Sequence, residues 1–512
     1  MVDTGDGFIG RLAMRVADDP SGLFARFDGD PITFEDLNRR SDSLAAWLSQ
    51  GAIAKGDRVA LMIRNSPTAL ALLFAIGKLG AVWVPINVQA RGDSLAHILS
   101  DSEPNRLIAE HEFLPVIEDC GAALGEDCIW TLGAPDAIRA VEPMLTRNLS
   151  FHEPAAAADD LFAIMYTSGT TGKPKGVMVS HRMLRFSGES VALVSGAGAG
   201  DAFHMWEPLF HIGGAQMIVL PLIRPVHLVM VERFSASAFW TQVRDYGASH
   251  IHFLGGILQL LLKQPPGALD TSHGARIAFG GGCPRGVWRA FEKRFAVEIR
   301  ESYGMTEASS ITSFNGHKLV GSVGKAVPWF EVAILDQNNR PLKTGERGEI
   351  VVRETQPGAL TAGYYKNPEA TARALRHGVL YTGDTGSFDS DGNMYFHGRN
   401  SDNVRVRGEN VTAWEVEHVA TGHPLVEDCA MIGVAAEIGE QEIKLFFKPK
   451  PASKLDSAAL SEWLATRLTD YQNPRYIAVV DEFERTPSQR IMKHKLSSET
   501  GDAWDRLDRA RR

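Results

Sequence analysis

The chain has 512 residues, of which 44% are hydrophobic and 22% charged, as expected of a folded protein with a large core. Its 53 basic and 62 acidic residues give a net charge of -9, which argues against a broad nucleic-acid-binding surface. The four cysteines lack the close spacing of a zinc site or a disulfide framework, so a reducing, cytoplasmic setting is expected.

The N-terminal segment MVDTGDGFIG is acidic at its start and has no apolar core of the signal-peptide type. The two most apolar stretches, residues 69–86 and 218–231, are interrupted by charged residues and prolines. A membrane span needs about 20 uninterrupted apolar residues, so we expect no span and interpret both stretches as buried helices and strands.

Residues 32–87 alternate between helical spacing of apolar residues and short apolar runs, which is typical of parallel α/β units. The same alternation returns at residues 234–256 and 286–304. After residue 320 the pattern changes to shorter strands with Gly and Asn turns.

Near the C-terminus the pattern predicts helices at 412–422 and 455–468 and strands at 427–437 and 442–450. These elements indicate a separate small α+β domain. We therefore expect a large domain at 1–400 and a small domain at 401–512. The basic ending DRLDRARR is expected to be a solvated tail.

The stretch YTSGTTGKPKGVMVSH, residues 166–181, combines glycines, hydroxyls and two lysines between two strand-like segments. Free backbone N–H groups, hydroxyls and ammonium groups suit a phosphate. A Walker loop is excluded, because Gly169 and Gly172 enclose only two residues and Pro174 follows Lys173. A flexible surface turn is the alternative.

Three further motifs add groups that suit a nucleotide. SYGMTE at 302–307 offers Thr306 and Glu307, a hydroxyl and a carboxylate suited to phosphate and magnesium. YTGDTG at 381–386 places Asp384 in a Gly-flanked turn, where it can accept ribose hydroxyls. GRNSD then supplies Arg399 and Asp402.

Together with EPLFHIGG, GRNSDNVRVRGENV and RTPSQRIMKHKL, these motifs resemble the adenylate-forming superfamily of acyl- and aryl-CoA synthetases, adenylation domains and luciferases. The resemblance covers nearly the whole chain and is nearest to the carnitine/crotonobetaine and fatty-acid CoA ligases. It implies a large α/β domain with parallel-sheet layers and a distorted barrel, and a small mobile C-terminal domain. The implied reaction joins a carboxylic acid to coenzyme A with ATP and Mg²⁺.

The resemblance also implies residue roles. The ATP phosphates would be held by Thr167, Ser168, Gly169, Thr170, Thr171, Gly172, Lys173 and Lys175. Adenine would be flanked by Gly281, Gly282, Cys283, Pro284, Tyr303 and Gly304. Thr306 would touch the α-phosphate, Glu307 with Thr170 would face magnesium, and Asp384 with Arg399 would hold the ribose. His211 would sit at the mouth of the acid pocket, Asp402 would be the hinge, and Arg407, Gly408 and Glu409 would serve the CoA step.

One position departs from the superfamily pattern. In TPSQRIMKHKL, Arg490 stands where a lysine would bridge the reacting carboxylate and phosphate. Arginine keeps the charge but differs in length and geometry. Lys493, one helical turn away, is the alternative cation. A smaller departure is Arg405, where lysine is more usual.

The substrate acid is less defined. Ser235 in FSAS stands where amino-acid adenylation domains place an aspartate, which disfavours an α-amino acid. The acid pocket is expected to use Trp206, Phe210 and Phe253 as apolar walls and Gly255 and Gly280 as space. Charge cues conflict, since Glu207 suits a cationic tail whereas His204, His252 and Arg285 suit an anionic one.

We expect a small or medium-length aliphatic acid with free CoA as acceptor; an aryl acid is the alternative. A rival of another class is a non-catalytic protein of this fold that binds an acid or a nucleotide. A homodimer is compatible with the sequence, which shows no oligomeric state by itself.

Overall fold

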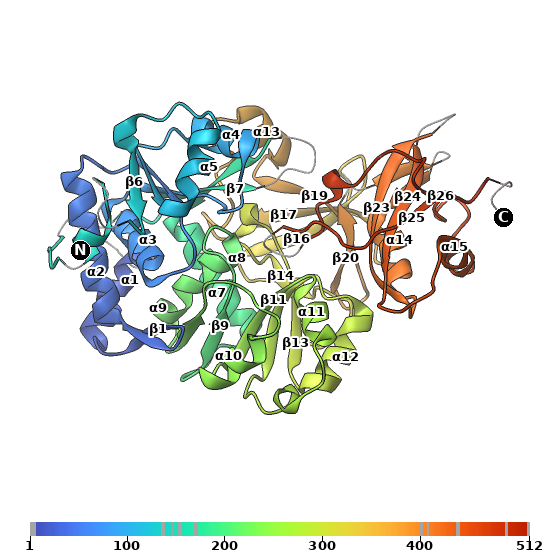
Figure 1. Ribbon diagram of the computed structural model, residues 1–512, viewed down its shortest axis with the longest axis horizontal. Coiled ribbons are helices and arrows are strands. Elements are labelled where there is room, and N and C mark those ends of the chain that lie inside the picture. Colours follow the sequence, from blue (N-terminus) through green and yellow to red (C-terminus); the bar gives the residue numbers. More distant parts are fainter. Residues whose placement is uncertain are drawn as a thin grey trace.

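The computed structural model describes residues 7–134, 139–145, 147–151, 156–167, 173–399, 403–406, 409–436, 441–486 and 490–508. Figure 1 shows a large body built from residues up to about 400 and a smaller C-terminal body beside it. The mixed α/β class expected from the sequence is confirmed, with two large sheets, a smaller curved sheet and a C-terminal α+β unit.

The first large sheet has six strands, which are parallel except for the last pair. In spatial order they are β6 (Ile129–Leu132), β5 (Arg106–Glu110), β3 (Arg58–Met62), β4 (Val82–Pro85), β7 (Leu161–Thr167) and β8 (Lys175–Ser180). The associated helices are α1 (Ile9–Asp18), α2 (Phe34–Gln50), α3 (Pro67–Leu79), α4 (Gly92–Ser102), α5 (Leu114–Asp119) and α6 (Glu142–Leu145).

Helix α3 accounts for the first apolar stretch. It begins at the Ser66 N-cap, whose side chain accepts the Ala69 N–H, and it ends at Gly80 in the left-handed conformation. Most of its residues are buried between the sheet and neighbouring helices, which explains why its sequence is apolar on nearly every face. A membrane-crossing helix would need more length and apolarity than any helix within the described ranges has.

The second large sheet has nine strands, and its central strands run parallel. In spatial order they are β15 (Lys325–Ala326), β14 (Ser313–Phe314), β13 (Glu298–Tyr303), β12 (Ile277–Gly281), β11 (His250–Leu254), β9 (Ala202–Met205), β10 (His227–Met230), β1 (Leu23–Phe27) and β2 (Asp30–Thr33). The helices of this part are α7 (His181–Ser195), α8 (Ile212–Ala215), α9 (Leu220–Ile223), α10 (Phe239–Asp245), α11 (Ile257–Lys263) and α12 (Arg285–Phe295).

A five-stranded antiparallel sheet follows and corresponds to the change of pattern after residue 320. Its strands are β16 (Phe330–Leu335), β17 (Gly348–Glu354), β18 (Leu375–Arg376), β19 (Val379–Phe388) and β20 (Met394–Arg399), with α13 (Pro368–Ala374) between β17 and β18. The prediction of a turn around Asp384 is wrong: this residue lies inside the long strand β19, where residues 381–385 bulge opposite β17. Gly383, with φ of 71°, allows that bulge.

The C-terminal unit has its own apolar core, which involves residues from Val404 to Ile477. Its elements are β21 (Asn403–Val406), β22 (Glu409–Thr412), α14 (Ala413–Thr421), β23 (Val426–Ala435), β24 (Gln441–Pro449), α15 (Ser457–Ala465), β25 (Tyr476–Val479) and β26 (Trp504–Asp505). Residues 505–508 are not a solvated tail as expected, because β26 pairs with β25 and Arg506 forms an ion pair with Asp470. The domain boundary at 400/401 stays a prediction.

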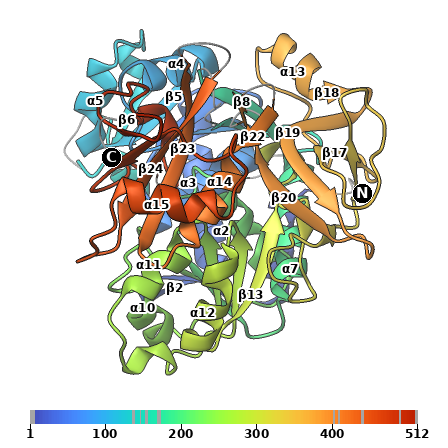
Figure 2. The ribbon, with the colours of Figure 1, turned by 90° about the vertical axis from the view of Figure 1, so that its right-hand side faces the viewer.

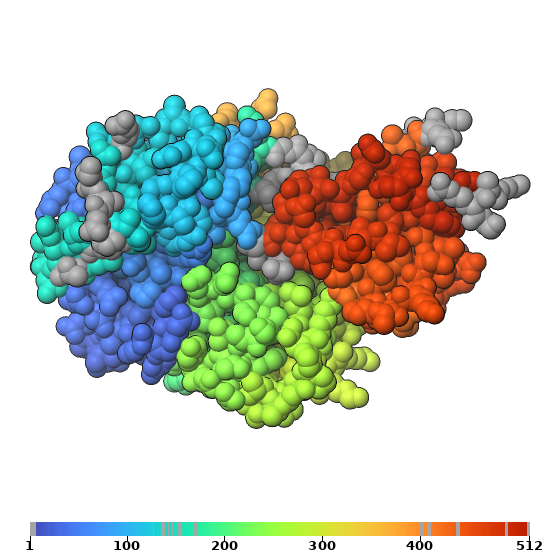
Figure 3. Space-filling view, viewed as in Figure 1, coloured from blue at the N-terminus to red at the C-terminus, as the bar shows by residue number. Residues whose placement is uncertain are grey.

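The C-terminal unit faces the large body across a defined set of contacts. Lys263 Nζ on α11 lies 2.6 Å from Glu427 Oε1 on β23, and Arg347 pairs with Glu415 on α14. Seen from its own side in Figure 2, this unit lies in front of the region where the three sheets of the large body meet. The space-filling view in Figure 3 shows it as a distinct body at one end of the molecule. The region between the two bodies is therefore where side chains from distant parts of the chain converge.

Candidate active site

The candidate site lies at the carboxyl ends of parallel strands of the nine-stranded sheet. Strands β9, β11, β12 and β13 end at Met205, Leu254, Gly281 and Tyr303, and the predicted site residues follow directly. Loops at this edge of a parallel sheet form a shared crevice, which is where open α/β sheets bind ligands. The topology therefore brings together motifs that are about 100 residues apart in the chain.

Asp384 occupies the part of the site predicted for ribose. It is buried, its Oδ2 accepts the Tyr303 hydroxyl at 2.7 Å, and Arg399 Nε lies 3.4 Å from its Oδ1. Burial raises the pKa of Asp384, although Arg399 and Tyr303 oppose that shift. Its Oδ1 is buried and accepts no hydrogen bond from the described residues, so it has the capacity that a ribose hydroxyl requires.

Glu307 and Lys175 are joined through Tyr364. The Tyr364 hydroxyl donates to Glu307 Oε1 at 2.9 Å, and Lys175 Nζ lies 5.3 Å from the centre of the Tyr364 ring. Thr306, one residue before Glu307, is buried. Tyr364 was missed in the sequence analysis because nothing in its local pattern distinguishes it from a core tyrosine.

The middle of the predicted phosphate loop, Ser168, Gly169, Thr170, Thr171 and Gly172, lies outside the described residues. The residues at the two ends of this loop are described. Thr167 ends β7 and Lys175 begins β8, so the loop connects two antiparallel strands as expected. His97 Nε2 lies 2.9 Å from the Pro174 carbonyl oxygen, and Lys173 is exposed.

Behind the predicted adenine segment lies a carboxyl group that the sequence analysis missed. Glu301 on β13 is buried, and its Oε1 accepts the N–H groups of Gly282 at 2.7 Å and Cys283 at 2.9 Å. Burial raises the pKa of Glu301 to about 8, and these two N–H groups oppose the shift. An acidic residue at an inward position of a buried strand, two residues before Tyr303, was the available signal.

At the acid end, a buried carboxylate lies between two imidazoles. Glu207 Oε2 is 2.7 Å from His252 Nδ1, and Glu207 Oε1 is 3.6 Å from His211 Nδ1. The Glu207 and His252 side chains are 2% and 6% exposed, whereas that of His211 is 35% exposed. The conflicting charge cues of the sequence are thus resolved in part, because Glu207 and His252 pair with each other.

The predicted pocket walls need correction. Trp206 and Phe253 are fully buried in the core beneath the site, where the Trp206 indole donates to the His252 carbonyl oxygen at 2.8 Å. They support the site and expose no surface to a ligand, whereas Phe210 and Gly255 are partly exposed. Gly280 is required for close strand approach, since a Cβ there would lie 1.8 Å from the Phe253 carbonyl oxygen.

The small unit directs Arg490 toward the site. Thr486 Oγ1 accepts the Arg490 N–H at 3.1 Å, which fixes the backbone at Arg490. Arg490 is exposed at the surface, but desolvation by the surrounding protein and the nearby Arg399 lower its pKa, while the charges of Asp384 and Glu207 raise it. Arg490 therefore lies within electrostatic range of both buried carboxylates. Lys493 Nζ instead lies 2.8 Å from Glu417 Oε1, within the small unit.

Some predicted residues cannot be placed. The hinge residue Asp402 and the CoA-side residues Arg407 and Gly408 lie outside the described residues. Glu409 begins β22, but its side chain is likewise outside the description. The hinge and CoA-side assignments stay predictions.

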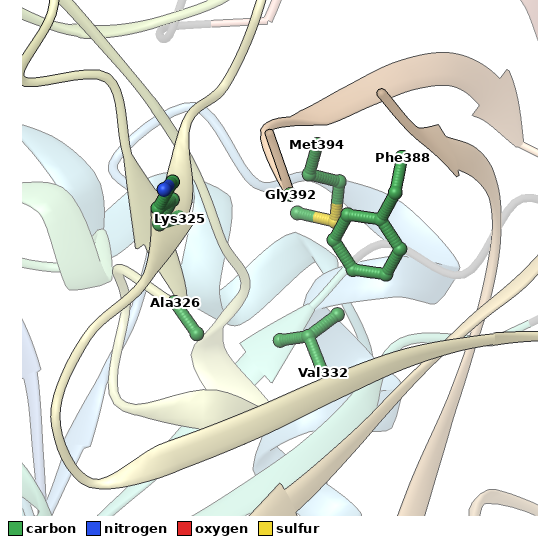
Figure 4. Close-up of a pocket in the computed structure, with 6 residues that line it drawn as sticks. All are labelled: Lys325, Ala326, Val332, Phe388, Gly392 and Met394. Carbon is green, nitrogen blue, oxygen red and sulfur yellow. The ribbon is translucent and has the colours of Figure 1, made fainter. Parts of the chain in front are cut away.

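Among the described residues, neither a metal cluster nor a separate cavity provides an alternative to this site. Within the described ranges, no three His, Cys, Asp or Glu side chains converge as a metal cluster would. A cavity of about 290 Å³ lies at the far end of β19 and β20 from Asp384 and Arg399 (Figure 4). Its lining residues are Lys325, Ala326, Val332, Phe388, Gly392 and Met394. None of them belongs to the predicted machinery.

Comparison with known proteins gives an independent assignment. Residues 12–365 match the family described as AMP-binding enzyme, and residues 415–490 match the AMP-binding enzyme C-terminal domain. The chain is 32% identical over 479 residues to a crotonobetaine/carnitine–CoA ligase of Salmonella paratyphi B, covering 91% of this chain and 93% of the relative.

Two solved structures share the fold at similar identity. An ATP-bound MatB from Rhodopseudomonas palustris is 25% identical with a TM-score of 0.86, covering 96% of this chain and 97% of its own. A Mycobacterium tuberculosis fatty acyl CoA synthetase is 26% identical with a TM-score of 0.75, covering 96% of this chain and 98% of its own.

Proposed function

Because the chain belongs to the AMP-binding enzyme family and is an adenylate-forming carboxylate–CoA ligase, we propose that it activates a small or medium-length aliphatic acid that carries a polar group. The observation that carries this proposal is the site itself. Asp384, with an unfilled acceptor, and the Glu207–His252 pair mark its two ends, and Arg490 faces both.

In the first half-reaction, a carboxylate oxygen of the acid attacks the α-phosphorus of ATP. The new O–P bond replaces the bond to pyrophosphate, which leaves, and an acyl adenylate remains. Both reactants are anions, so the chain must bring them together in line and balance their charge. We assign Arg490 to the bridge between them, because Lys493 is engaged by Glu417.

The remaining side chains position the nucleotide. Asp384 and Arg399 would hold the ribose, with Tyr303 fixing the Asp384 carboxylate. The Glu301 carboxyl group would fix the backbone of Gly282 and Cys283 against adenine. Lys175 and the loop that begins at Thr167 would hold the phosphates. Magnesium, when bound, neutralises phosphate charge, and Glu307 with Thr170 would hold it.

In the second half-reaction, the CoA thiolate attacks the acyl carbonyl carbon. A C–S bond forms, the C–O bond to AMP breaks, and AMP leaves. This step needs no nucleophile from the chain. We propose that the small domain rotates about Asp402 and brings Arg407, Gly408 and Glu409 to the site.

The choice of acid rests on two observations. The curated relative reported above is named for crotonobetaine and carnitine, which favours a small polar acid. The acid end presents the partly exposed His211 imidazole where a long alkyl chain would need an apolar lining. The aryl-acid alternative is less favoured, because Trp206 and Phe253 present no aromatic surface to a ligand.

The direct test is pyrophosphate release with ATP, Mg²⁺ and one of butyrate, octanoate, benzoate or crotonobetaine, followed by detection of the acyl-CoA. We expect the highest kcat/KM with crotonobetaine or butyrate. A clear preference for benzoate or octanoate would overturn the acid assignment. Binding without pyrophosphate release for every acid would favour the non-catalytic rival.

The cellular setting and assembly are also proposals. The four cysteines are free, as expected in a reducing compartment, which supports a cytoplasmic location. A homodimer would be tested by sedimentation or light scattering of the purified chain. A role in fatty-acid metabolism depends on which acid the panel identifies.

A further inference from the structure

The buried Glu207–His252 pair has no part in the reaction described so far, yet it lies directly beneath His211. Glu207 follows β9, His252 lies on the adjacent strand β11, and His211 precedes α8. The carboxylate is 2.7 Å from one imidazole and 3.6 Å from the other. Burying a carboxylate is unfavourable unless charged partners compensate, so this arrangement needs an explanation.

The backbone around the carboxylate is shaped to admit it. A Cβ on Gly213 would lie 2.4 Å from Glu207 Oε2, so only glycine leaves room for the carboxylate there. The Gly213 N–H donates to His211 Nδ1 at 3.1 Å, which fixes the imidazole over the same spot. Asn65 donates to the Glu207 carbonyl oxygen at 2.8 Å and accepts the Leu209 N–H at 2.9 Å, which holds the segment in place.

Glu207, His252 and His211 differ in exposure, and this difference indicates which of them can contact a ligand. Glu207 and His252 are buried, whereas His211 is partly exposed at the cleft. Only His211 can therefore touch a bound acid, and the other two can act only through it.

We propose that Glu207 and His252 form a positioning pair for the acid: Glu207 fixes the His211 imidazole at the cleft and makes that ring more basic, and His252 weakens the effect of Glu207. Because His211 Nδ1 accepts the Gly213 N–H, the proton of this ring lies on Nε2, which would donate a hydrogen bond to the carboxylate of the acid beside Arg490. This proposal rests on the proposed function, because it assigns the acid to the His211 side of the cleft.

The charges around His211 determine the direction in which each substitution should shift its pKa. The groups that act on His211 are Glu207 from the β9–α8 connection, His252 from β11 and Arg490 from the small unit. The pKa of His211 lies below its ordinary value: burial lowers it most, Glu207 opposes that shift, and Arg490 and His252 lower it further. Replacing Glu207 by a neutral residue should therefore lower the pKa of His211, whereas replacing His252 should raise it.

The experiment measures the His211 pKa by NMR of ¹³C-labelled histidine rings, with the His211 signal identified by its loss in His211→Asn. Glu207→Gln should lower this pKa by about one to three pH units, the range for an opposite charge at this distance. His252→Gln should raise it. Glu232→Gln, an exposed carboxylate after β10, is the matched control and should leave it unchanged.

Kinetics provide the second readout. With the best of the four acids named above, Glu207→Gln should raise the KM for the acid about tenfold, a cost typical of a lost charge-assisted contact. The KM for ATP should change less than about twofold, because a merely structural loss would affect both substrates alike.

Equal pKa values in wild type and both variants, or shifts in the same direction, would overturn the proposal. If Glu207→Gln does not fold, as judged by circular dichroism, His252→Gln carries the test, because its predicted increase requires an intact Glu207. The pKa measurement needs no turnover. Absence of acid-dependent pyrophosphate release in the wild type would therefore refute the proposed function separately from this inference.

Discussion

Asp384 and Glu207 are both buried carboxylates at the same cleft, but their surroundings differ. Asp384 meets a phenol and, at 3.4 Å, a guanidinium, and one of its oxygens accepts no hydrogen bond from the described residues. Glu207 lies between two imidazoles. Burial raises the pKa of Asp384, whereas the histidines bring that of Glu207 below its ordinary value despite burial.

This difference fits the roles proposed above, in which Asp384 binds a ligand and Glu207 positions another side chain. An under-satisfied acceptor such as Asp384 costs stability in the free protein, and a ligand that donates hydrogen bonds recovers that cost. The Glu207 oxygens also accept no hydrogen bond from the described residues, but two imidazoles lie beside them and the side chain is 2% exposed, so Glu207 offers little to a ligand. Arg490 lies within electrostatic range of Asp384 and Glu207, so replacing Arg490 should affect both the nucleotide end and the acid end of the site.

The largest effect is expected for Arg490→Gln. Losing a cation that stabilises developing charge costs about 10²–10³ in kcat, so pyrophosphate release should fall by that factor. Thioester formation from preformed acyl adenylate should be nearly unaffected, because that step follows rotation of the small domain. Lys493→Gln is the matched control and should retain most adenylation activity; the reverse ranking of the two variants would assign the role to Lys493.

A smaller effect is expected for Asp384→Asn. Hydrogen bonds to a charged group contribute about 1.5–3 kcal/mol, so the KM for ATP should rise by about 10- to 100-fold. The KM for the acid should change much less, in contrast to Glu207→Gln. Asp391→Asn, in the exposed turn after β19, is the control for the hairpin. An unchanged KM for ATP would remove Asp384 from the ribose site.

The last effect is on the free energy of unfolding, which should change in opposite directions when Asp384 and Glu207 are replaced. The raised pKa of Asp384 means that its ionisation costs stability as pH rises above the ordinary value of 3.8. Asp384→Asn removes this ionisation and should therefore raise the free energy of unfolding at pH 7.

For Glu207 the lowered pKa means that its ionised form adds stability above the ordinary value of 4.5, and this is lost as pH falls through the folded-state pKa. Glu207→Gln should therefore lower the free energy of unfolding at pH 7 by about 3 kcal/mol, as expected for a broken buried pair. Thermal unfolding at pH 7 and near pH 4 measures both variants. Tm changes of the same sign at pH 7 would contradict the comparison.

Much of the architecture was predictable because it depends on local pattern. The strands around the phosphate loop, the helix that became α3 and the helices and strands of the small domain occur where periodicity placed them. The prediction of a turn at Asp384 was wrong because Gly383 lies in a bulge within a strand, which a local pattern does not distinguish from a turn. The prediction of a solvated tail was wrong because β26 pairs with β25, a contact that forms only in the folded sheet.

The sequence by itself determined the reaction class, since its motifs and their order resemble those of the adenylate-forming superfamily. Only the tertiary structure decided which side chains pair. Glu207 meets His252 because β9 and β11 are neighbours in the sheet, and Lys493 is engaged by Glu417 rather than by the cleft. Such pairings depend on how strands order within a sheet and how the two bodies pack, and short-range chemistry along the chain does not specify either.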